Sequence, residues 1–261
     1  MMARQLIWSE TFEPRDSGRP DPKVWNFDLG DGSAHGIPGW GNNEREFYLD
    51  SAASVDDGLT FHAIREPENS PHQTYYGPAE WTSSKIHTFG KISFQYGYFE
   101  FIAKAPHGGG SWPAIWMLGT AIAHTPWPAC GEIDIFEGTG NEPQTIRGTL
   151  HGPGYSGEFG VTAATTYPTL LSDEFITYGL LWLPNRIEWS VNGVTYSVIT
   201  SDDSRLEGKA WPFNAPHYLI MNLAIGGWFA GDVDPALNEA IFEVKSVKVY
   251  SADGIGSVEL H

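Results

Sequence analysis

The chain has 261 residues, a length that a β-sandwich or barrel often reaches as one domain. Its 41% hydrophobic and 18% charged residues exclude disorder as the main state, and no apolar run approaches the ~20 residues of a membrane helix. Acidic residues outnumber basic ones by 32 to 15, and the net charge of −17 argues against nucleic acid and anionic membranes as partners. The 11 tryptophans favour instead an uncharged ligand with flat apolar faces, such as a sugar.

Short strands are the predicted elements along the whole chain. Alternating residues predict a strand over 91–104, and the change of phase at Gly97 predicts a bulge or bend. Helical periodicity is weak, with one short turn expected at 170–176, and an Asn-Gly pair predicts a hairpin over 186–199. This pattern predicts an all-β sandwich or barrel, with residues 1–261 as a single domain. Further strands are expected at 5–12, 45–49, 59–64, 113–118, 132–137, 146–151, 177–182, 217–225 and 240–250.

Three acids interleave with apolar residues in the segment WPACGEIDIFEG, residues 127–138. In a strand, Glu132 and Asp134 share one face, whereas Glu137 returns to that face only if a bulge at 135–136 adds a residue. Two carboxyl groups on one face suit glycoside hydrolysis, in which one attacks while the other holds a proton. A solvated strand face is the alternative interpretation, and the neighbouring glycines and tryptophans argue against it.

The acid motif E-I-D-I-F-E resembles the catalytic signature of glycoside hydrolase family 16 in its bulged form. The similarity runs from about Leu6 to Tyr250 and is greatest to the bacterial laminarinase type, the endo-β-1,3-glucanases. It implies a jelly-roll β-sandwich of two antiparallel sheets, concanavalin A-like, with an open concave cleft and a retaining mechanism. Three further segments match the family in the same order: GWGNNEREFY (39–48), GSWPAIWML (110–118) and HGPGYSG (151–157).

The resemblance implies a role for each acid: Glu132 as the nucleophile, Glu137 as the general acid/base, and Asp134 as the hydrogen-bonding partner of the nucleophile. Polar and aromatic residues are candidate substrate contacts: Trp116, Trp112, His151, Asn42, Glu44, Trp127, Lys85 and Trp228. The alternatives stay open, because a tryptophan can belong to the core, an asparagine loop can be a simple turn, and a histidine can pack beneath its loop.

Some positions depart from the family pattern. Lys85 stands where many members have an arginine that faces the glucan, and lysine lacks the planar fork of arginine. The loop GGWFAG (226–231) replaces a common G-G-N-W-P-G loop. Lys245 stands where many members have a calcium-binding aspartate, so a structural calcium ion is disfavoured. No cofactor and no metal site are expected, and the single cysteine, Cys130, is interpreted as a buried filler.

The expected partner is a β-1,3-glucan polysaccharide or oligosaccharide, with mixed β-1,3/1,4-glucan as a second substrate, and the chain is expected to be a monomer. Two alternatives remain: the same mechanism on agarose or carrageenan, and a non-catalytic carbohydrate-binding sandwich. The net charge argues against sulfated polymers, and the intact pair Glu132 and Glu137 argues against a lectin. The N-terminus lacks the apolar core of a signal peptide, whereas the resemblance implies an extracellular location.

Overall fold

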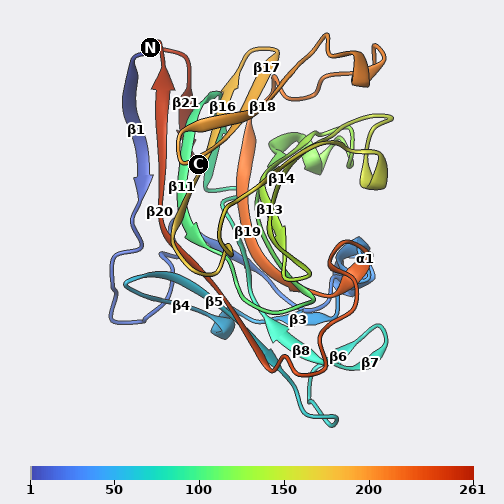
Figure 1. Cartoon of the computed structure of the whole chain (residues 1–261). Coiled ribbons are helices and arrows are strands. Elements are labelled where there is room, and N and C mark those ends of the chain that lie inside the picture. Colours follow the sequence, from blue (N-terminus) through green and yellow to red (C-terminus); the bar gives the residue numbers. More distant parts are fainter. Residues whose placement is uncertain (1) are drawn as a thin grey trace.

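The computed structural model describes residues 2–261, which form two large sheets packed face to face (Figure 1). The back sheet contains β1 (Arg4–Glu10), β3 (Glu46–Tyr48), β4 (Ala53–Asp56), β5 (Gly58–Arg65), β8 (Trp81–Ser83), β11 (Gly97–Lys104), β16 (Ile176–Leu183), β17 (Arg186–Val191), β18 (Val194–Thr200) and β20 (Glu239–Ala252). The front sheet contains β2 (Asn26–Asp28), β9 (Lys85–His87), β10 (Ile92–Gln95), β12 (Ser111–Gly119), β13 (Glu132–Thr139), β14 (Glu142–His151), β15 (Val161–Thr166), β19 (His217–Ile225) and β21 (Ser257–Leu260).

The remaining elements are short. A two-stranded hairpin consists of β6 (Gln73–Thr74) and β7 (Gly77–Pro78), and α1 (Gly227–Ala230) is a single helical turn. None of the helices within residues 2–261 is long and apolar enough to cross a membrane. The described part of the chain also has six 3-10 turns, at Ser33–His35, Pro38–Gly41, Asp50–Ala52, Thr120–Ala123, Gly157–Phe159 and Ser204–Leu206.

The strand order places the acidic strand inside the front sheet. That order is β15-β14-β13-β12-β19-β10-β21, with β9 beside β19 and β2 beside β9. The back sheet has the order β18-β17-β16-β11-β20-β5-β8-β3, with β1 beside β20 and β4 beside β5. The large sheets are antiparallel apart from the parallel pair β3 and β8. The predicted sandwich of two antiparallel sheets is therefore confirmed.

The break predicted at Gly97 separates two strands that belong to different sheets. Tyr96 and Gly97 both have positive φ angles, 62° and 118°, and the chain passes there from β10 in the front sheet to β11 in the back sheet. The predicted hairpin over 186–199 is present, with positive φ at both residues of its Asn-Gly turn. A hydrogen-bonded turn lies within 170–176. Eight short strands were not predicted: β2, β4, β6, β7, β8, β9, β15 and β21.

The core lies between the two sheets and is rich in aromatic side chains. Phe136 of β13 stacks on Tyr178 of β16, with ring centroids 4.0 Å apart. Trp182 and Trp189 of the back sheet are fully buried. Each large apolar side chain buried in this way stabilises the fold by about 1.5–3 kcal/mol. Cys130 is buried and free, as the sequence predicted.

Candidate active site

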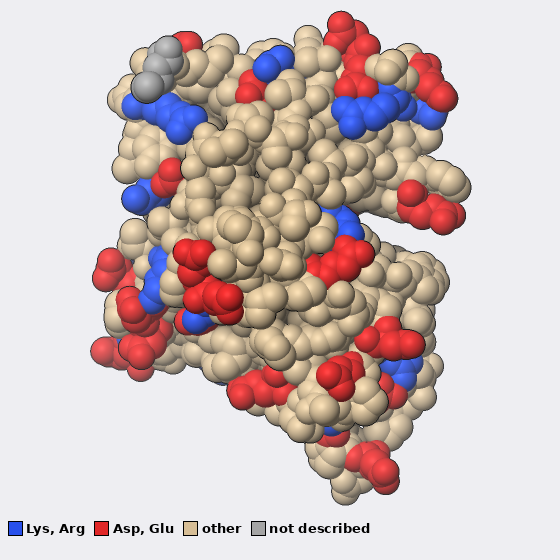
Figure 2. Space-filling model, viewed as in Figure 1, with Lys and Arg blue, Asp and Glu red and all other residues tan. Residues whose placement is uncertain are grey.

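The open face of the front sheet forms a cleft that contains the acidic strand. Figure 2 shows the molecule hollowed on its right side, above the position of α1 in Figure 1, with β13 and β14 behind the hollow. Strands β12, β19, β9 and β2 follow one another on one side of β13, whereas β14 and β15 lie on the other side. At about 4.8 Å per strand, the first group extends roughly 19 Å from β13. A polymer can therefore lie across the sheet and pass over β13.

A bulge in β13 turns the three acids of the motif to one face. Along β12, two consecutive residues pair with Asp134 and Phe136, so Ile135 is an extra residue in β13. Along β14, the partners of Asp134 and Glu137 are two positions apart, whereas these two acids are three positions apart in β13. The predicted bulge is therefore present, and it returns Glu137 to the face of Glu132 and Asp134.

Each glutamate of the motif accepts a hydrogen bond from a tryptophan indole. Trp127 Nε1 donates to Glu132 Oε2 over 2.7 Å, and Trp112 Nε1 donates to Glu137 Oε1 over 3.1 Å. Thr149 Oγ1 lies 3.5 Å from Glu137 Oε2, at the limit of a hydrogen bond. An indole N–H orients a carboxyl group without adding a charge. Trp127 is therefore a partner of the predicted nucleophile as well as part of the loop before it.

Burial and mutual repulsion raise the pKa values of the three acids. Burial raises the pKa of Glu137 to about 8, and the charge of Asp134 adds to this effect. Burial also raises the pKa of Glu132, but the charge of His151 and the hydrogen bond from Trp127 oppose that rise. The pKa of Asp134 is raised by burial and then by the charge of Glu132. Glu137 is thus suited to hold a proton, whereas Glu132 has neighbours that favour its ionised form.

His151 supplies a positive charge among these acids. Its Nε2 lies 3.1 Å from Asp134 Oδ2 and 3.7 Å from Glu132 Oε1. Burial lowers the pKa of His151, but the hydrogen bond to Asp134 and the surrounding carboxylates raise it by more, so the pKa is about 9. The imidazole is therefore charged at neutral pH. The structure places His151 against Asp134 and Glu132, whereas the resemblance had implied a place beside Glu137.

The two tryptophans of β12 share one face, as their spacing predicted, but they have different partners. Trp112 donates to Glu137 and packs against Phe229, with ring centroids 4.9 Å apart. Trp116 Nε1 donates over 2.8 Å to Asn222 Oδ1 of β19. Both tryptophans are only partly buried, so neither is a core residue. Each keeps an exposed part against which a sugar ring can pack.

Lys85 lies between two aromatic rings, three strands away from β13. Its Nζ is 4.1 Å from the ring centroid of Trp40 and 5.2 Å from that of Trp116. Asp28 Oδ2 lies 3.3 Å from the same ammonium group. The ion pair and the two ring faces hold the largely buried lysine in place. Lys85, Trp40 and Trp116 together form a polar and aromatic surface at this end of the front sheet.

Trp228 lies in α1 and is the most exposed of the predicted contacts, with 77% of its surface accessible. Its backbone N–H donates to the carbonyl of Asn42 over 2.9 Å, which ties α1 to the Gly-Asn-Asn loop. The neighbouring Phe229 covers Trp112. The loop 226–231 therefore presents one aromatic side chain to the solvent and packs the next one onto the partner of Glu137.

Asn42 and Glu44 lie in the loop beside α1, and Glu44 is buried. Asn42 Nδ2 donates to Glu44 Oε1 over 2.9 Å, and Tyr48 Oη donates to Glu44 Oε2 over 3.2 Å. Glu46 is 1% exposed, and its Oε2 accepts the Ile225 N–H over 2.7 Å. Burial, the charge of Glu44 and a hydrogen bond between the two carboxyl groups raise the pKa of Glu46 well above its ordinary value. The raised pKa favours the protonated form of Glu46 beside Glu44.

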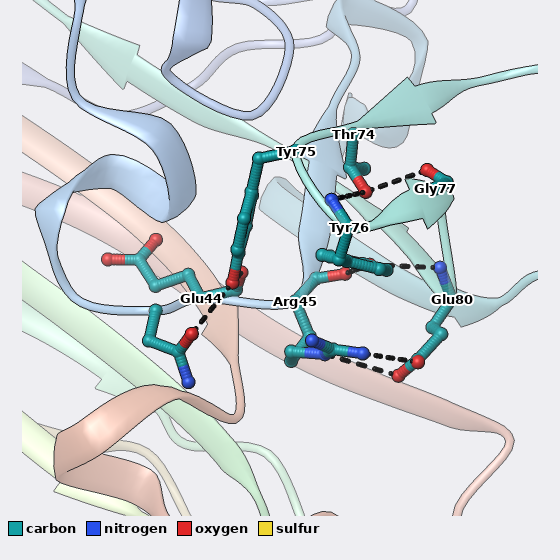
Figure 3. Close-up of polar contacts among 8 residues, drawn as sticks. Glu44, Arg45, Thr74, Tyr75, Tyr76, Gly77 and Glu80 are labelled. Atoms are coloured by element: carbon teal, nitrogen blue, oxygen red, sulfur yellow. Dashed lines mark hydrogen bonds and ion pairs between the residues drawn. The ribbon is translucent and has the colours of Figure 1, made fainter.

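The hairpin of β6 and β7 braces this loop (Figure 3). Tyr75 Oη donates to the Glu44 carbonyl over 3.2 Å, and Tyr76 Oη donates to the Arg45 carbonyl. The Arg45 guanidinium lies 3.6 Å from the centroid of the Tyr76 ring and forms an ion pair with Glu80. The hairpin thus fixes the backbone on which the side chain of Glu44 is presented.

Comparison with known proteins decides the family. The model for glycosyl hydrolases family 16 matches residues 41–245. The chain belongs to glycosyl hydrolases family 16. A beta-glucanase from Rhodothermus marinus is 37% identical over 258 residues, which cover 94% of this chain and 85% of that protein. The family predicted from the motifs is therefore confirmed, and the chain is a glycoside hydrolase.

Two solved structures of similar proteins support the same assignment. The catalytic domain of an endo-1,3-beta-glucanase (laminarinase) from Thermotoga petrophila RKU-1 superposes with a TM-score of 0.89 and 39% identity. That match covers 97% of this chain and 99% of the other. An endo-beta-1,3-glucanase from Pyrococcus furiosus gives a TM-score of 0.88 and 39% identity, with 95% of each chain covered. The fold around the cleft is therefore that of family 16 glucanases.

Four residues of the site are not among those predicted from the sequence: Trp40, Glu46, Thr149 and Asn222. Thr149 lies two residues from both Arg147 and His151 in β14, so the three share one face of the strand. The period of two could therefore have revealed Thr149 as a residue of the site. Asn222 is distant in sequence from Trp116, and no local pattern connects the two. Trp40 belongs to a loop whose buried side cannot be told from its exposed side by composition. Glu46 begins strand β3, and the sequence alone does not show that its carboxyl group is buried.

Glu132, Asp134 and His151 bring ligand atoms within 4.8 Å of one another, a spacing that could hold a metal ion. A protonated imidazole has no free lone pair for a metal, so at neutral pH His151 acts as the counter-ion of the two acids. The hydrolase requires no cofactor. On the back sheet, Lys245 Nζ donates to Asp57 Oδ2 over 2.6 Å. This ammonium group pairs with a carboxylate at the position where many family members have a calcium-binding aspartate, and the expectation that calcium is disfavoured stays a prediction.

Proposed function

We propose that the chain hydrolyses β-1,3-glucan internally and with retention of configuration, with mixed β-1,3/1,4-glucan as a second substrate. The observation that carries the proposal is the bulge of β13, which brings Glu132, Asp134 and Glu137 to one face beside a charged His151. The relatives support the substrate, because the two solved structures named above are endo-1,3-glucanases.

In the first step, Glu137 acts as the acid. Its proton passes to the glycosidic oxygen, while a carboxylate oxygen of Glu132 attacks the anomeric carbon and forms a glycosyl–enzyme ester. Trp112 orients Glu137 through its indole, and Trp127 does the same for Glu132. Asp134 and His151 lie against Glu132 and set the charge around the nucleophile.

In the second step, Glu137 acts as the base. A water molecule gives its proton to the ionised Glu137 and attacks the anomeric carbon from the face that the leaving group vacated, which releases Glu132. Two inversions give net retention. Because the ester removes the charge of Glu132, the pKa of Glu137 falls between the two steps, and this favours the change from acid to base.

The cleft supports internal cleavage of a long chain. Several strands of the front sheet continue beyond β13 on both sides, so the sheet presents surface to sugar units on either side of the scissile bond. Trp116, Lys85, Asn42 and Trp228 lie along this surface and are the proposed sugar contacts. Glu44 is proposed to act from the buried side, by orienting Asn42.

The setting of the enzyme is also proposed. Residues 1–261 are taken as one catalytic domain, since one continuous core joins the two sheets. A monomer that acts outside the cell is the simplest form for an enzyme whose substrate is a large polysaccharide. The net charge of −17 supports the expectation that neither nucleic acid nor an anionic membrane is a partner.

Reducing-sugar release from laminarin, barley β-glucan and agarose tests the proposal. Laminarin should be cleaved fastest, barley β-glucan second, and agarose not at all. Early products from laminarin should be oligosaccharides of several sizes, because internal bonds are cut. Release of a single small product from the start would show exo-action. Cleavage of agarose but not of laminarin would show that the substrate is agarose and not β-1,3-glucan. Binding of laminarin without any release would instead favour the carbohydrate-binding alternative.

A further inference from the structure

One tryptophan of the back sheet reaches across the core to the catalytic strand. Trp189 in β17 is fully buried, and its Nε1 donates to the backbone carbonyl of Asp134 over 2.8 Å. The two residues belong to different sheets, so this hydrogen bond links the layers directly. The register of β13 shifts immediately after Asp134 against both of its neighbours, β12 and β14. The indole therefore binds β13 where its regular ladder is interrupted.

The neighbouring strand is shaped to admit this indole. A Cβ atom at Gly148 in β14 would lie 2.3 Å from both Cδ1 and Nε1 of Trp189, closer than any side chain allows. Thr149, the next residue, pairs with Asp134 and lies against the carboxyl group of Glu137. The glycine at position 148 in β14 thus leaves room for the Trp189 indole to reach the backbone of β13 from the core side.

We propose that Trp189 is a positioning residue for the catalytic bulge, in which its indole N–H holds the Asp134 carbonyl and so fixes the backbone that turns Glu137 toward the cleft. A buried carbonyl without a donor is costly, and a bulge is a point where a strand can bend in more than one way. With the carbonyl held, the bulge has one conformation. This inference rests on the proposed role of Glu137.

The chain offers a matched control in the same core. Trp182 in β16 is also fully buried in the back sheet, and its Nε1 also donates to a backbone carbonyl, that of Phe213, over 2.7 Å. Phe213 is not part of the catalytic strand. Trp182→Phe and Trp189→Phe therefore remove the same atoms and the same kind of hydrogen bond, but only the second change releases the bulge.

The test compares the two variants with the wild type on laminarin across pH. Both variants should lower the thermal midpoint. Trp189→Phe should lower kcat about tenfold to a hundredfold with KM within about twofold, because the acids move and the sugar contacts do not. Its alkaline limb of kcat should move to lower pH, since a Glu137 freed from its buried position loses the cause of its raised pKa. Trp182→Phe should keep the wild-type kcat and the wild-type limb.

Equal kcat values and equal alkaline limbs in the two variants would overturn the proposal, because Trp189 would then act only as packing. If Trp189→Phe does not fold, NMR of wild-type protein with 15N-labelled tryptophan decides. The indole N–H of Trp189 should shift as the acid cluster titrates, whereas that of Trp182 should not, and equal responses would refute the link. An inactive wild type would contradict the proposed function instead, so the two failures are distinguishable.

Discussion

Two clusters of buried carboxyl groups lie along the cleft, and they handle their charge differently. In the first, Glu132 and Asp134 surround His151, whose raised pKa keeps a cation between them. In the second, Glu44 and Glu46 meet without a cation, since within residues 2–261 no lysine, arginine or histidine side chain pairs with either group. Burial and the charge of Glu44 instead raise the pKa of Glu46 well above its ordinary value, which favours its protonated form.

The difference indicates what each cluster is for. A carboxylate beside a charged histidine stays ionised and can attack, whereas a protonated carboxyl group is a hydrogen-bond donor and cannot. The first cluster can thus change its charge during a reaction cycle. The second can only hold Glu44, and through it Asn42, in one orientation. The reacting groups therefore lie on β13, whereas the Glu44 and Glu46 cluster at the start of β3 only positions Asn42.

The largest effect should follow from removing the charge that attacks. Glu132→Gln keeps the shape of the side chain but cannot attack the anomeric carbon, so kcat on laminarin should fall at least about a thousandfold, or about 4 kcal/mol of barrier. Asp134→Asn should cost less, because Asp134 tunes the nucleophile. Circular dichroism should show an unchanged fold. If the Glu132→Gln variant kept more than about a tenth of the wild-type kcat, the assignment of Glu132 as the nucleophile would be wrong.

The second largest effect should follow from removing the positive charge of His151. The charge of His151 lowers the pKa values of both Glu132 and Glu137, so in His151→Gln both should rise. Both limbs of the pH profile of kcat/KM should move to higher pH, and the value at neutral pH should fall about tenfold to a hundredfold. Unchanged limbs would mean that the imidazole does not act as the counter-ion of the acids.

The buried pair of Glu44 and Glu46 predicts a stability difference between the wild type and a Glu46 variant that depends on pH. The folded pKa of Glu46 is raised, so its contribution to stability is complete below the unfolded pKa near 4.5 and is lost as pH rises toward the folded value. Glu46→Gln has no proton to lose. It should match the wild type at pH 4 and exceed its free energy of unfolding by about 1–3 kcal/mol at pH 8.

Asp31 provides the control for that experiment. Its buried carboxylate accepts hydrogen bonds from the Ser33 N–H and hydroxyl and from the Tyr75 N–H. Asp31→Asn should therefore destabilise the protein at pH 8, opposite to Glu46→Gln. If denaturant unfolding showed Glu46→Gln to be the less stable protein at pH 8, then Glu46 would be ionised and the contrast between the clusters would fail.

The smallest effect is expected from removing metal ions. The spacing of Glu132, Asp134 and His151 resembles a metal site, but the protonated imidazole already provides a positive charge beside the two acids. Lys245 likewise provides the positive charge beside Asp57. EDTA should leave kcat unchanged and shift the thermal midpoint by less than about 1 °C. A loss of activity that added calcium or zinc restores would show that one of these clusters binds metal.

Local patterns predict the parts of the fold that depend on neighbours in sequence. The hairpin over 186–199 follows from an Asn-Gly turn, and the bulge of β13 follows from the spacing of the acids. At Gly97 the pattern showed a break but not that the chain changes sheets there, because strand order depends on contacts between distant segments. Short strands such as β2 and β9 have too few residues to show a period of two.

The same limit applies to the site. The three acids stand out because of their residue type and spacing, whereas His151 was expected in the cleft from the resemblance to the family. The raised pKa of Glu46 does not stand out, since it depends on burial that the fold creates. The hydrogen bond from Trp189 to the Asp134 carbonyl does not stand out in the sequence either. The alternation of the hairpin indicates only that Trp189 is a core residue. Chemistry can be predicted from a motif, whereas its support comes from the opposite sheet.

The roles of the two glutamates are tested most directly by the configuration of azide products. With an activated aryl glycoside, Glu137→Ala should form the glycosyl–enzyme and then release a β-glycosyl azide, because azide enters where the base stood. Glu132→Ala should give an α-product, because azide occupies the face of the missing nucleophile. Proton NMR distinguishes the two anomers. A β-azide from Glu137→Ala and an α-azide from Glu132→Ala are the predicted result, and the opposite pair of configurations would contradict the account.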